Sequence, residues 1–340
     1  MFRQDRTNPS TAVSNWKGRR ATKRGHTQTA VSNWLNGGLF GTGSYVLGST
    51  GGYWGGGGGH ESSVDRLRFE VDIMDHVVIG FISTYAYATG ISDGDTAAYL
   101  AFDYPSSPTA DEIQKHTFAT DVASTISETV TTPRSSGVCG MGDDVQGLWC
   151  GGYDSARMNE TSRFIYATEL ESEGQDIVGA RNTCQGISGE AFGYVCYGYT
   201  DSGNVATCDK MTYDGGRSAG QSTPVAVSGG TACSDVDVAG YISVYNADGA
   251  GGTDDVWKFA FSTENWSTLS NVLVGGYQHF AGAGTGVSDA SGFGWLGGMN
   301  RSNCPNPEKV AFASDTFSAV SWQHDHSTMY NNGAWANGWL

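Results

Sequence analysis

The segment KHTFATD, Lys115 to Asp121, decides the fold because its pattern returns at a regular interval. A basic residue is followed three positions later by Phe or Tyr, and in five copies an acidic residue stands three positions further on. The six aromatic residues are 49, 48, 47, 48 and 51 positions apart. The basic and aromatic pairs are Arg66 and Phe69, Lys115 and Phe118, Arg163 and Tyr166, Lys210 and Tyr213, Lys258 and Phe261, and Lys309 and Phe312.

A second repeated sequence feature, which we call the GY mark, keeps nearly the same period. A glycine or another small residue precedes an aromatic or apolar residue at Tyr53, Tyr99, Leu148, Tyr194, Tyr241 and Trp295, with spacings of 46, 49, 46, 47 and 54. Repeats of about this length that hold only strand-like segments are typical of β-propeller blades. The sequence therefore predicts an all-β fold, a six-bladed β-propeller over residues 41–340, preceded by an extended N-terminal arm over residues 1–40.

The two marks also suggest approximate blade limits of 46–92, 93–141, 142–188, 189–234, 235–288 and 289–340. The C-terminal stretch STMYNNGAWANGWL, from Ser327 to Leu340, reads as the outer part of the sixth blade. We expect residues 38–49, GLFGTGSYVLGS, to add to the last blade and close the ring, because closure removes exposed sheet edges.

The basic residues of the repeat have a predicted place in the blade. Side chains alternate between the two faces of a strand, so each basic residue lies opposite the aromatic residue that follows it. Blade sheets pack against neighbours on both faces, and we expect the six basic residues to be partly buried and paired across blades. The alternative is a ring of six cations that holds an anion at the axis.

Composition supports a strand-rich body with a different N-terminal segment. Gly 50, 12% aromatic and 16% charged residues argue against both disorder and helix. Residues 1–40 hold seven basic residues and one acidic residue, 7 − 1 = +6, which leaves 12 − 34 = −22 for the remainder. A cationic arm on an acidic body suggests docking to an acidic partner or to nucleic acid.

The arm carries the hexapeptide TAVSNW twice, at Thr11–Trp16 and again at Thr29–Trp34, and we call each copy a word. Each copy suits an extended peptide whose Trp fills a pocket while its backbone adds to a sheet edge. Two copies could meet equivalent pockets on neighbouring subunits and so strengthen anchoring. The alternative is a tandem duplication without consequence. The predicted partner-binding residues of the arm are Val13, Trp16, Lys17, Arg19, Arg20, Lys23, Arg24, Val31 and Trp34.

Candidate chemistry is sparse, and we expect no enzymatic activity, no catalytic residues, no cofactor and no metal. The seven cysteines show no zinc-like spacing and read as buried free thiols. The glycine run 55–59 lacks the Lys that a phosphate loop needs. His324 and His326 could bind a metal through two imidazoles on one strand face, but this segment offers three ligands at most and no partner cluster. The acidic loop 248–255 could bind calcium, but an ordinary acidic loop is the favoured explanation.

The repeat resembles a known family. The GY-x-x-GG mark and the segment from Ile113 to Asp121 are similar to the kelch-like repeats of tailed-bacteriophage virion proteins, over roughly residues 45–340. The second blade lacks the double glycine, and the fourth copy lacks the terminal acidic residue. The resemblance implies a structural or host-recognition role in a virus particle, and it carries over no catalytic residues.

The function that follows is a structural virion protein, anchored by the arm to other virion proteins and presenting the propeller for protein–protein or host-surface binding. Tail or tail-fibre association is favoured over the head, with no membrane insertion and with nucleic acid an unlikely partner. No secretory signal is evident, so we expect synthesis in the host cytoplasm. The alternatives are a propeller that recognises a glycan receptor and, less favoured, a propeller-fold glycan hydrolase.

Overall fold

The structure is a computed structural model that describes residues 51–55, 64–77, 89–102, 110–135, 137–244, 255–270, 285–289, 292–297, 307–320 and 333–336. The chain divides into two units, Met1–Val46 and Leu47–Leu340, and all of the described residues lie in the second. No helix in the described ranges is long and apolar enough to cross a membrane. The predicted arm and its partner-binding residues lie outside the described residues.

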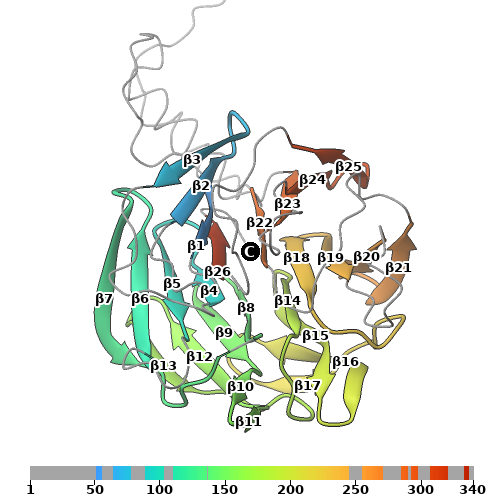
Figure 1. The fold of residues 1–340 in the computed structure, drawn as a ribbon, viewed down its shortest axis with the longest axis horizontal. Helices are drawn as coiled ribbons and strands as arrows, with labels where there is room; N and C mark the ends of the chain where they lie inside the picture. Colours follow the sequence, from blue (N-terminus) through green and yellow to red (C-terminus); the bar gives the residue numbers. More distant parts are fainter. Residues whose placement is uncertain are drawn as a thin grey trace, which may run out of the picture. The chain divides into compact units, whose positions relative to one another are not determined.

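The described residues form six four-stranded antiparallel sheets, and this confirms the predicted six-bladed β-propeller (Figure 1). We number the blades along the chain and give their strands from the inner to the outer edge. The first three are β26 (Gly333–Ala336), β1 (Gly51–Gly55), β2 (Val64–Arg68) and β3 (Ile73–Val77); β4 (Thr89–Ser92), β5 (Ala97–Ala101), β6 (Glu112–Thr117) and β7 (Val122–Thr129); and β8 (Cys139–Gly142), β9 (Gln146–Cys150), β12 (Thr161–Ile165) and β13 (Leu170–Glu173).

The remaining three blades follow the same plan. They are β14 (Gln185–Ser188), β15 (Phe192–Thr200), β16 (Gly203–Thr212) and β17 (Arg217–Ala219); β18 (Gly230–Asp235), β19 (Ala239–Val244), β20 (Val256–Ala260) and β21 (Asn265–Leu269); and β22 (Thr285–Ser288), β23 (Phe293–Gly297), β24 (Glu308–Ala311) and β25 (Thr316–Ala319). A short hairpin, β10 (Tyr153–Asp154) and β11 (Ala156–Arg157), leaves the third blade.

The six inner strands surround the axis of the propeller (Figure 1). Each packs beside the inner strands of two neighbouring blades, in the closed order β26, β4, β8, β14, β18, β22 and back to β26. The spacing between them is very close. A Cβ atom on Gly186 of β14 would lie 2.4 Å from the carbonyl oxygen of Gly140 on β8, and one on Gly140 would lie 2.3 Å from the carbonyl oxygen of Gly90 on β4. Only very small residues fit at this position of an inner strand.

Ring closure differs from the prediction. The C-terminal strand β26 is the inner strand of the first blade, where Trp335 lies opposite Tyr53 and Ala334 opposite Trp54. The C-terminal stretch was expected at the outer edge of the sixth blade, and this was wrong for residues 333–336. Residues 38–49, expected to close the ring, lie outside the described residues. The two ends of the propeller are therefore joined by antiparallel pairing of β26 with β1, which covers the edge that β1 would otherwise expose.

The strands are also grouped into sheets differently from the approximate blade limits. From the second GY mark onward, the strand before the mark belongs to the same sheet as the mark, as β4 does with β5 and β22 with β23. The suggested limits placed these strands at the end of the preceding blade. The reason is that each of the inner strands β4, β8, β14, β18 and β22 joins the next strand through a short turn, so the strand and the mark form one hairpin.

Candidate functional site

A recurring polar cluster joins each of five blades to the next. At the junction of the fifth and sixth blades, Tyr241 donates its hydroxyl to Oδ1 of Asp315 at 2.6 Å. The ammonium Nζ of Lys258 lies 2.7 and 2.8 Å from the two carboxylate oxygens of Asp315. Tyr241 is the aromatic residue of the GY mark, Lys258 is the basic residue of the repeat, and Asp315 follows the next aromatic residue. We call this arrangement a junction clamp.

Four other junctions repeat the clamp with the same three roles. The distance from the aromatic donor to the carboxylate oxygen is 2.9 Å for Tyr53, 3.2 Å for Tyr99, 3.3 Å for Tyr194 and 3.2 Å for the indole nitrogen of Trp295. The last clamp connects the sixth blade back to the first. The sets are Tyr53, Arg66 and Asp121; Tyr99, Lys115 and Glu169; Tyr194, Lys210 and Glu264; and Trp295, Lys309 and Asp72.

The acidic residue of each clamp is held by a tight turn between the two outer strands. All five acids have a left-handed backbone with φ between 52 and 55°. In this turn the N–H of Asp72 donates to the carbonyl of Arg68 at 2.9 Å, and the N–H of Glu264 donates to the carbonyl of Ala260 at 2.8 Å. The turn explains why the acid stands three positions after the aromatic residue, since that spacing aims both side chains at the neighbouring blade.

The repeat aromatic residues complete the junctions by stacking. Phe312 stacks on Tyr241 with ring centroids 5.2 Å apart, and Phe69 stacks on Trp295 at 4.8 Å. The pairs Tyr53 with Phe118, Tyr99 with Tyr166 and Tyr194 with Phe261 are stacked in the same way. The six equivalent residues are not equally buried: Phe118, Tyr166, Tyr213 and Phe312 are buried, whereas Phe69 and Phe261 are half-buried.

The junction of the third and fourth blades has no clamp. Leu148 stands where the others have Tyr or Trp, and Gly216 stands where the others have the acid. Arg163 instead donates through Nε and Nη2 to the side-chain oxygen of Gln146 within its own blade, at 2.8 and 2.6 Å. Leu148 and Tyr213 keep the apolar part of the junction, since both belong to one buried cluster.

Five of the six repeat basic residues therefore form ion pairs with the next blade, as the repeat predicted, and Arg163 does not. Their side chains are between 13 and 30% exposed. The carboxylates of the next blade neutralise their charges, so these five residues supply no free cations for an anion at the axis. The repeat charges serve the contact between blades.

Burial changes the titration of groups in the clamps. It is the main cause that raises the pKa of Tyr53 far above its usual value, and the charge of Asp121 adds to it. Tyr53 therefore keeps its proton and remains a hydrogen-bond donor. His116, on β6 beside the same clamp, has its pKa lowered to about 4 by burial and by the nearby charge of Arg66.

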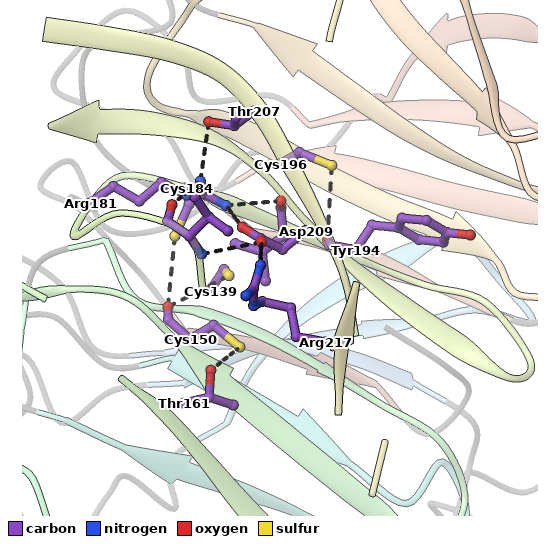
Figure 2. Close-up of polar contacts among 12 residues, drawn as sticks. Cys139, Cys150, Thr161, Arg181, Cys184, Tyr194, Cys196, Thr207, Asp209 and Arg217 are labelled. Carbon is purple, nitrogen blue, oxygen red and sulfur yellow. Dashed lines mark hydrogen bonds and ion pairs between the residues drawn. The ribbon is translucent and has the colours of Figure 1, made fainter. Parts of the chain in front are cut away.

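A buried arginine lies in the segment between the third and fourth blades and bonds the strands of the fourth (Figure 2). Arg181 is fully buried, and its guanidinium lies 2.6 Å from Asp209 and 3.3 Å from the carbonyl oxygen of Val195. Arg217 approaches the other oxygen of the same carboxylate at 3.3 Å. Arg134 is its equivalent one blade earlier, and it donates to the carbonyl of Trp149 at 2.8 Å. The two arginines tie the chain between blades to the middle strands.

Six cysteines are described, and all six are buried free thiols; Cys304 lies outside the described residues. Cys139 and Cys150 lie opposite each other on β8 and β9, and Cys184 lies close by (Figure 2). A hydrogen bond with the Cys139 thiol is the main cause that lowers the pKa of Cys184, and the charge of Arg181 adds to it. No group of three or more metal-ligating side chains occurs in the described part of the chain.

The described surface of the third and fourth blades carries an exposed tyrosine–arginine cluster. Strands β15 and β16 extend beyond a bulge at Tyr197, whose φ is 41°. The extension presents Tyr199, which is 41% exposed, and the guanidinium carbon of Arg157 lies 4.4 Å from its ring centre. Arg157 also forms an ion pair with Asp201. Tyr153, opposite Arg157 in the β10–β11 hairpin, is 38% exposed. We call these four residues the tyrosine surface.

Several predicted candidates are not placed. Residues 56–59 of the glycine run, the acidic loop 248–254 and the histidines at 324 and 326 lie outside the described residues, and so does the whole arm. The tyrosine surface was missed because nothing periodic marks it. The clamps were predicted only in part, because the sequence marks the acids but not their tyrosine partners. Each tyrosine lies one blade away from its acid and more than 60 positions away in the sequence. Tyr53 and Asp121, for example, are 68 positions apart.

Comparison with known proteins identifies the fold and nothing narrower. No protein-family model matches the chain, and no curated protein matches it. Among solved structures, the one titled "Structure of YjhT" is similar with a TM-score of 0.60 and 10% sequence identity, over 81% of this chain and 97% of that chain. At that identity the similarity concerns the fold alone, and it agrees with a propeller.

Proposed function

We propose that this protein is a non-enzymatic structural protein of a tailed-phage particle, anchored by its N-terminal arm and presenting the propeller for binding. The observation that supports anchoring and display is the use of the repeat charges. In five clamps the repeat charges pair one blade with the next, while residues 1–40 keep a separate charge of 7 − 1 = +6. A body whose blades are tied together and that carries a cationic extension fits anchoring and display.

The kelch-like character of the repeat adds support for the virion assignment. The GY mark and the basic–aromatic–acidic segment both have a defined role in the junctions, so the resemblance to phage virion repeats rests on residues that build the fold. The particle assignment itself rests on that resemblance, and association with the tail is favoured over the head.

Particle composition tests this proposal. Mass spectrometry of purified particles of the phage that encodes the chain should detect the protein in a fixed ratio to the other virion proteins. Trp16→Ala combined with Trp34→Ala should reduce its incorporation while the propeller stays folded. Thr22→Ala, in the linker between the two words, is the matched control. Absence from purified particles, or normal incorporation of the double variant, would contradict the anchoring role.

A second candidate, recognition of a host-surface glycan, is favoured by the tyrosine surface. Exposed aromatic rings beside an arginine and a carboxylate combine apolar stacking with directional hydrogen bonds, and Tyr and Arg are enriched where proteins bind partners. A glycan array with the full chain would identify a ligand. Tyr199→Ala and Tyr153→Ala should weaken that binding by about tenfold or more, and Val238→Ala, which replaces another exposed side chain on the fifth blade, should not.

A propeller hydrolase is the third and least favoured reading. Saturable cleavage of a host polysaccharide, abolished by one carboxylate substitution, would replace the non-enzymatic proposal. Binding without cleavage would agree with it.

A further inference from the structure

The inner strands of the propeller share a five-residue pattern that continues into the following turn. It reads Thr, then Gly or Ala, then a buried apolar residue, then Ser, then Asp. Three blades show it in full: Thr89–Asp93 as TGISD, Thr231–Asp235 as TACSD and Thr285–Asp289 as TGVSD. The inner strands β8 and β14 show it in part, as CGMGD and QGISG. Each position of the pattern has a physical reason in the structure.

The second and third positions fit the inner strand between its neighbours. At the second position, a Cβ atom on Gly286 would lie 2.3 Å from the carbonyl oxygen of Ala232, the residue at the same position in the preceding blade. Ala232 shows that a single methyl group can be accommodated and is 7% exposed. At the third position, Ile91 and Val287 are 0% exposed and fill the junction between blades. A larger residue at the second position would collide with the neighbouring inner strand.

The fourth and fifth positions supply hydrogen bonds. The hydroxyl of Ser188 accepts the N–H of Gly142 in the preceding blade at 3.2 Å, and the hydroxyl of Ser234 accepts the N–H of Ser188 at 3.0 Å. At the fifth position, the Asp93 carboxylate accepts the N–H groups of Asp95, Thr96 and Ala97 and so forms the turn into the next strand. The side-chain oxygen of Asn can form the same type of turn.

The repeated word of the arm matches this pattern at its first four positions and has Asn, which can form the same turn, at the fifth. Thr-Ala-Val-Ser-Asn occurs at residues 11–15 and at residues 29–33. The strand that occupies the inner position of the first blade matches less well. Its sequence with the following residue, Gly333 to Asn337, is GAWAN, which keeps the small second residue and the Asn but has neither the Thr nor the Ser. The chain thus holds two better inner-strand sequences than the one in place.

We propose that the TAVSN word of one chain replaces β26 as the inner strand of the first blade in a second copy of this chain. Paired with β1 in the register of β26, Val31 would lie opposite Tyr53, Ala30 opposite Trp54 and Thr29 opposite Gly55, and Val13, Ala12 and Thr11 would take the same places for the other word. Ser32 would bring the hydroxyl that Ala336 does not have. The added strand continues a sheet by main-chain hydrogen bonds, with small buried side chains setting its register.

The number of words points to a second copy as the partner. Each propeller has one inner position in its first blade, and β26 of the same chain occupies it. One ring therefore cannot hold both words at this position, whereas an arm with two words can bind two other copies and link a series of them. This self-assembly does not depend on the virion proposal, since it concerns the chain alone.

The test uses the full chain, whose monomer mass is 35.9 kDa. Light scattering across a concentration series, after unfolding and refolding to allow exchange, should give assemblies of two or more copies. Ala12→Leu with Ala30→Leu places a large side chain at the close-packed second position and should return the chain to 35.9 kDa. Ala21→Leu, the same change between the two words, should leave assembly unaltered. Trp16→Ala with Trp34→Ala should also leave it unaltered, because the pattern has no fixed residue after the Asn.

A cross-link tests the register directly. In a mixture of isotope-labelled and unlabelled chains that carry both Thr29→Cys and Gly55→Cys, mass spectrometry should find a disulfide between the two positions on different chains. Thr27→Cys with Gly55→Cys should give several-fold less of it. The proposal is overturned by a full chain that stays monomeric throughout, by Leu variants that assemble like the parent, by Trp variants that lose assembly, or by a disulfide found within single chains only. The Trp variants also separate this inference from particle anchoring, in which both Trp residues bind.

Discussion

At the scale of single residues, the geometry of each clamp is set by an acid in a left-handed turn. The strength of its ion pair is set by how far water is excluded from the two charges. Side-chain exposure of the ion pairs differs between junctions. Arg66 and Asp121 are 13 and 12% exposed, whereas Lys115 and Glu169 are 30 and 35% exposed. Water screens an exposed pair and weakens it, and a partly buried pair is screened less. We therefore expect the five clamps, which are alike in geometry, to differ in strength.

Double-mutant cycles should therefore rank the clamps by burial. We expect a coupling energy of roughly 1–3 kcal/mol between Arg66 and Asp121, measured with Arg66→Met, Asp121→Asn and the double variant by denaturant unfolding. Lys115 and Glu169 should couple by less than about 1 kcal/mol. Equal coupling in the two pairs would show that burial does not control clamp strength.

His116 occupies a position where the other repeats have an apolar residue: Leu67, Phe164, Met211, Phe259 and Val310. Its folded-state pKa of about 4 lies below the ordinary value of 6.5, so the unfolded chain takes up this proton first as the pH falls. The unfolding free energy is therefore highest above pH 6.5, where the imidazole is neutral in both states, and it decreases as the pH falls toward 4. The loss amounts to about 3 kcal/mol over that range.

His116→Leu should therefore flatten the pH dependence of the unfolding free energy between pH 6.5 and 4, because leucine binds no proton. The measurement is denaturant unfolding at a series of pH values, with the parent chain as reference. The other groups that titrate in this range are the same in both proteins, so the difference between the two slopes isolates His116. Parallel slopes would contradict the assignment.

At the scale of elements, the inner strands are tightly constrained by their neighbours in the adjoining blades. Their second position faces a neighbouring carbonyl oxygen, and so the allowed residue is Gly or Ala whatever the strand propensity. Beta-branched residues, which ordinarily favour strands, are excluded there by the neighbouring blade. Packing between blades overrides local preference at this one position.

Gly186→Val should destabilise the propeller severely, by more than the roughly 1–3 kcal/mol typical of an overfilled core, because backbone atoms of β8 cannot move aside. Its Cβ would begin 2.4 Å from the Gly140 oxygen. Ala232→Gly, at the same position one blade later, should cost only about 1 kcal/mol. Thermal unfolding of the two variants checks the contrast, and similar melting temperatures would argue against the described packing.

At the scale of the whole molecule, the ring is closed twice between the first and sixth blades. The clamp of Trp295, Lys309 and Asp72 joins the outer parts of these blades, and β26 brings the C-terminal end of the chain into the first sheet. The clamp joins side chains of two sheets, whereas β26 joins the end of the chain to another sheet through the backbone. Closure at the centre thus depends on one short strand.

Removing residues 333–340 should leave the inner edge of β1 unpaired. We expect a lower melting temperature and increased self-association, measured by calorimetry and light scattering, because an uncovered strand edge recruits other strands. Asp72→Asn removes only the clamp and should lower the melting temperature by a smaller amount. A truncated chain that melts like the full chain and stays monomeric would contradict the role of β26.

The sequence predicted the fold class and the number of blades because two independent marks keep one period. The pairing of basic residues across blades followed from alternation along a strand. Closure was not predictable from these marks, since they lie on the second and third strands of each blade and on the turn that follows, and neither includes an inner strand. The tyrosine partners of the acids and the tyrosine surface were also missed. The former lie a blade away from their acids, and the latter belongs to a hairpin and a strand extension that neither repeated mark covers.

The unclamped junction between the third and fourth blades has a consequence for ancestry. Leu148 and Gly216 stand where the other five junctions have the aromatic donor and the acid, and Arg163 donates to Gln146. Loss of only one partner would leave a half-buried charge or hydroxyl unpaired. This lowers the stability of the fold more than the loss of both partners does. Descendants of one ancestral ring should therefore keep or lose the two positions as a pair. The blade at which the pair is missing would then mark a lineage, even where overall sequence similarity has faded.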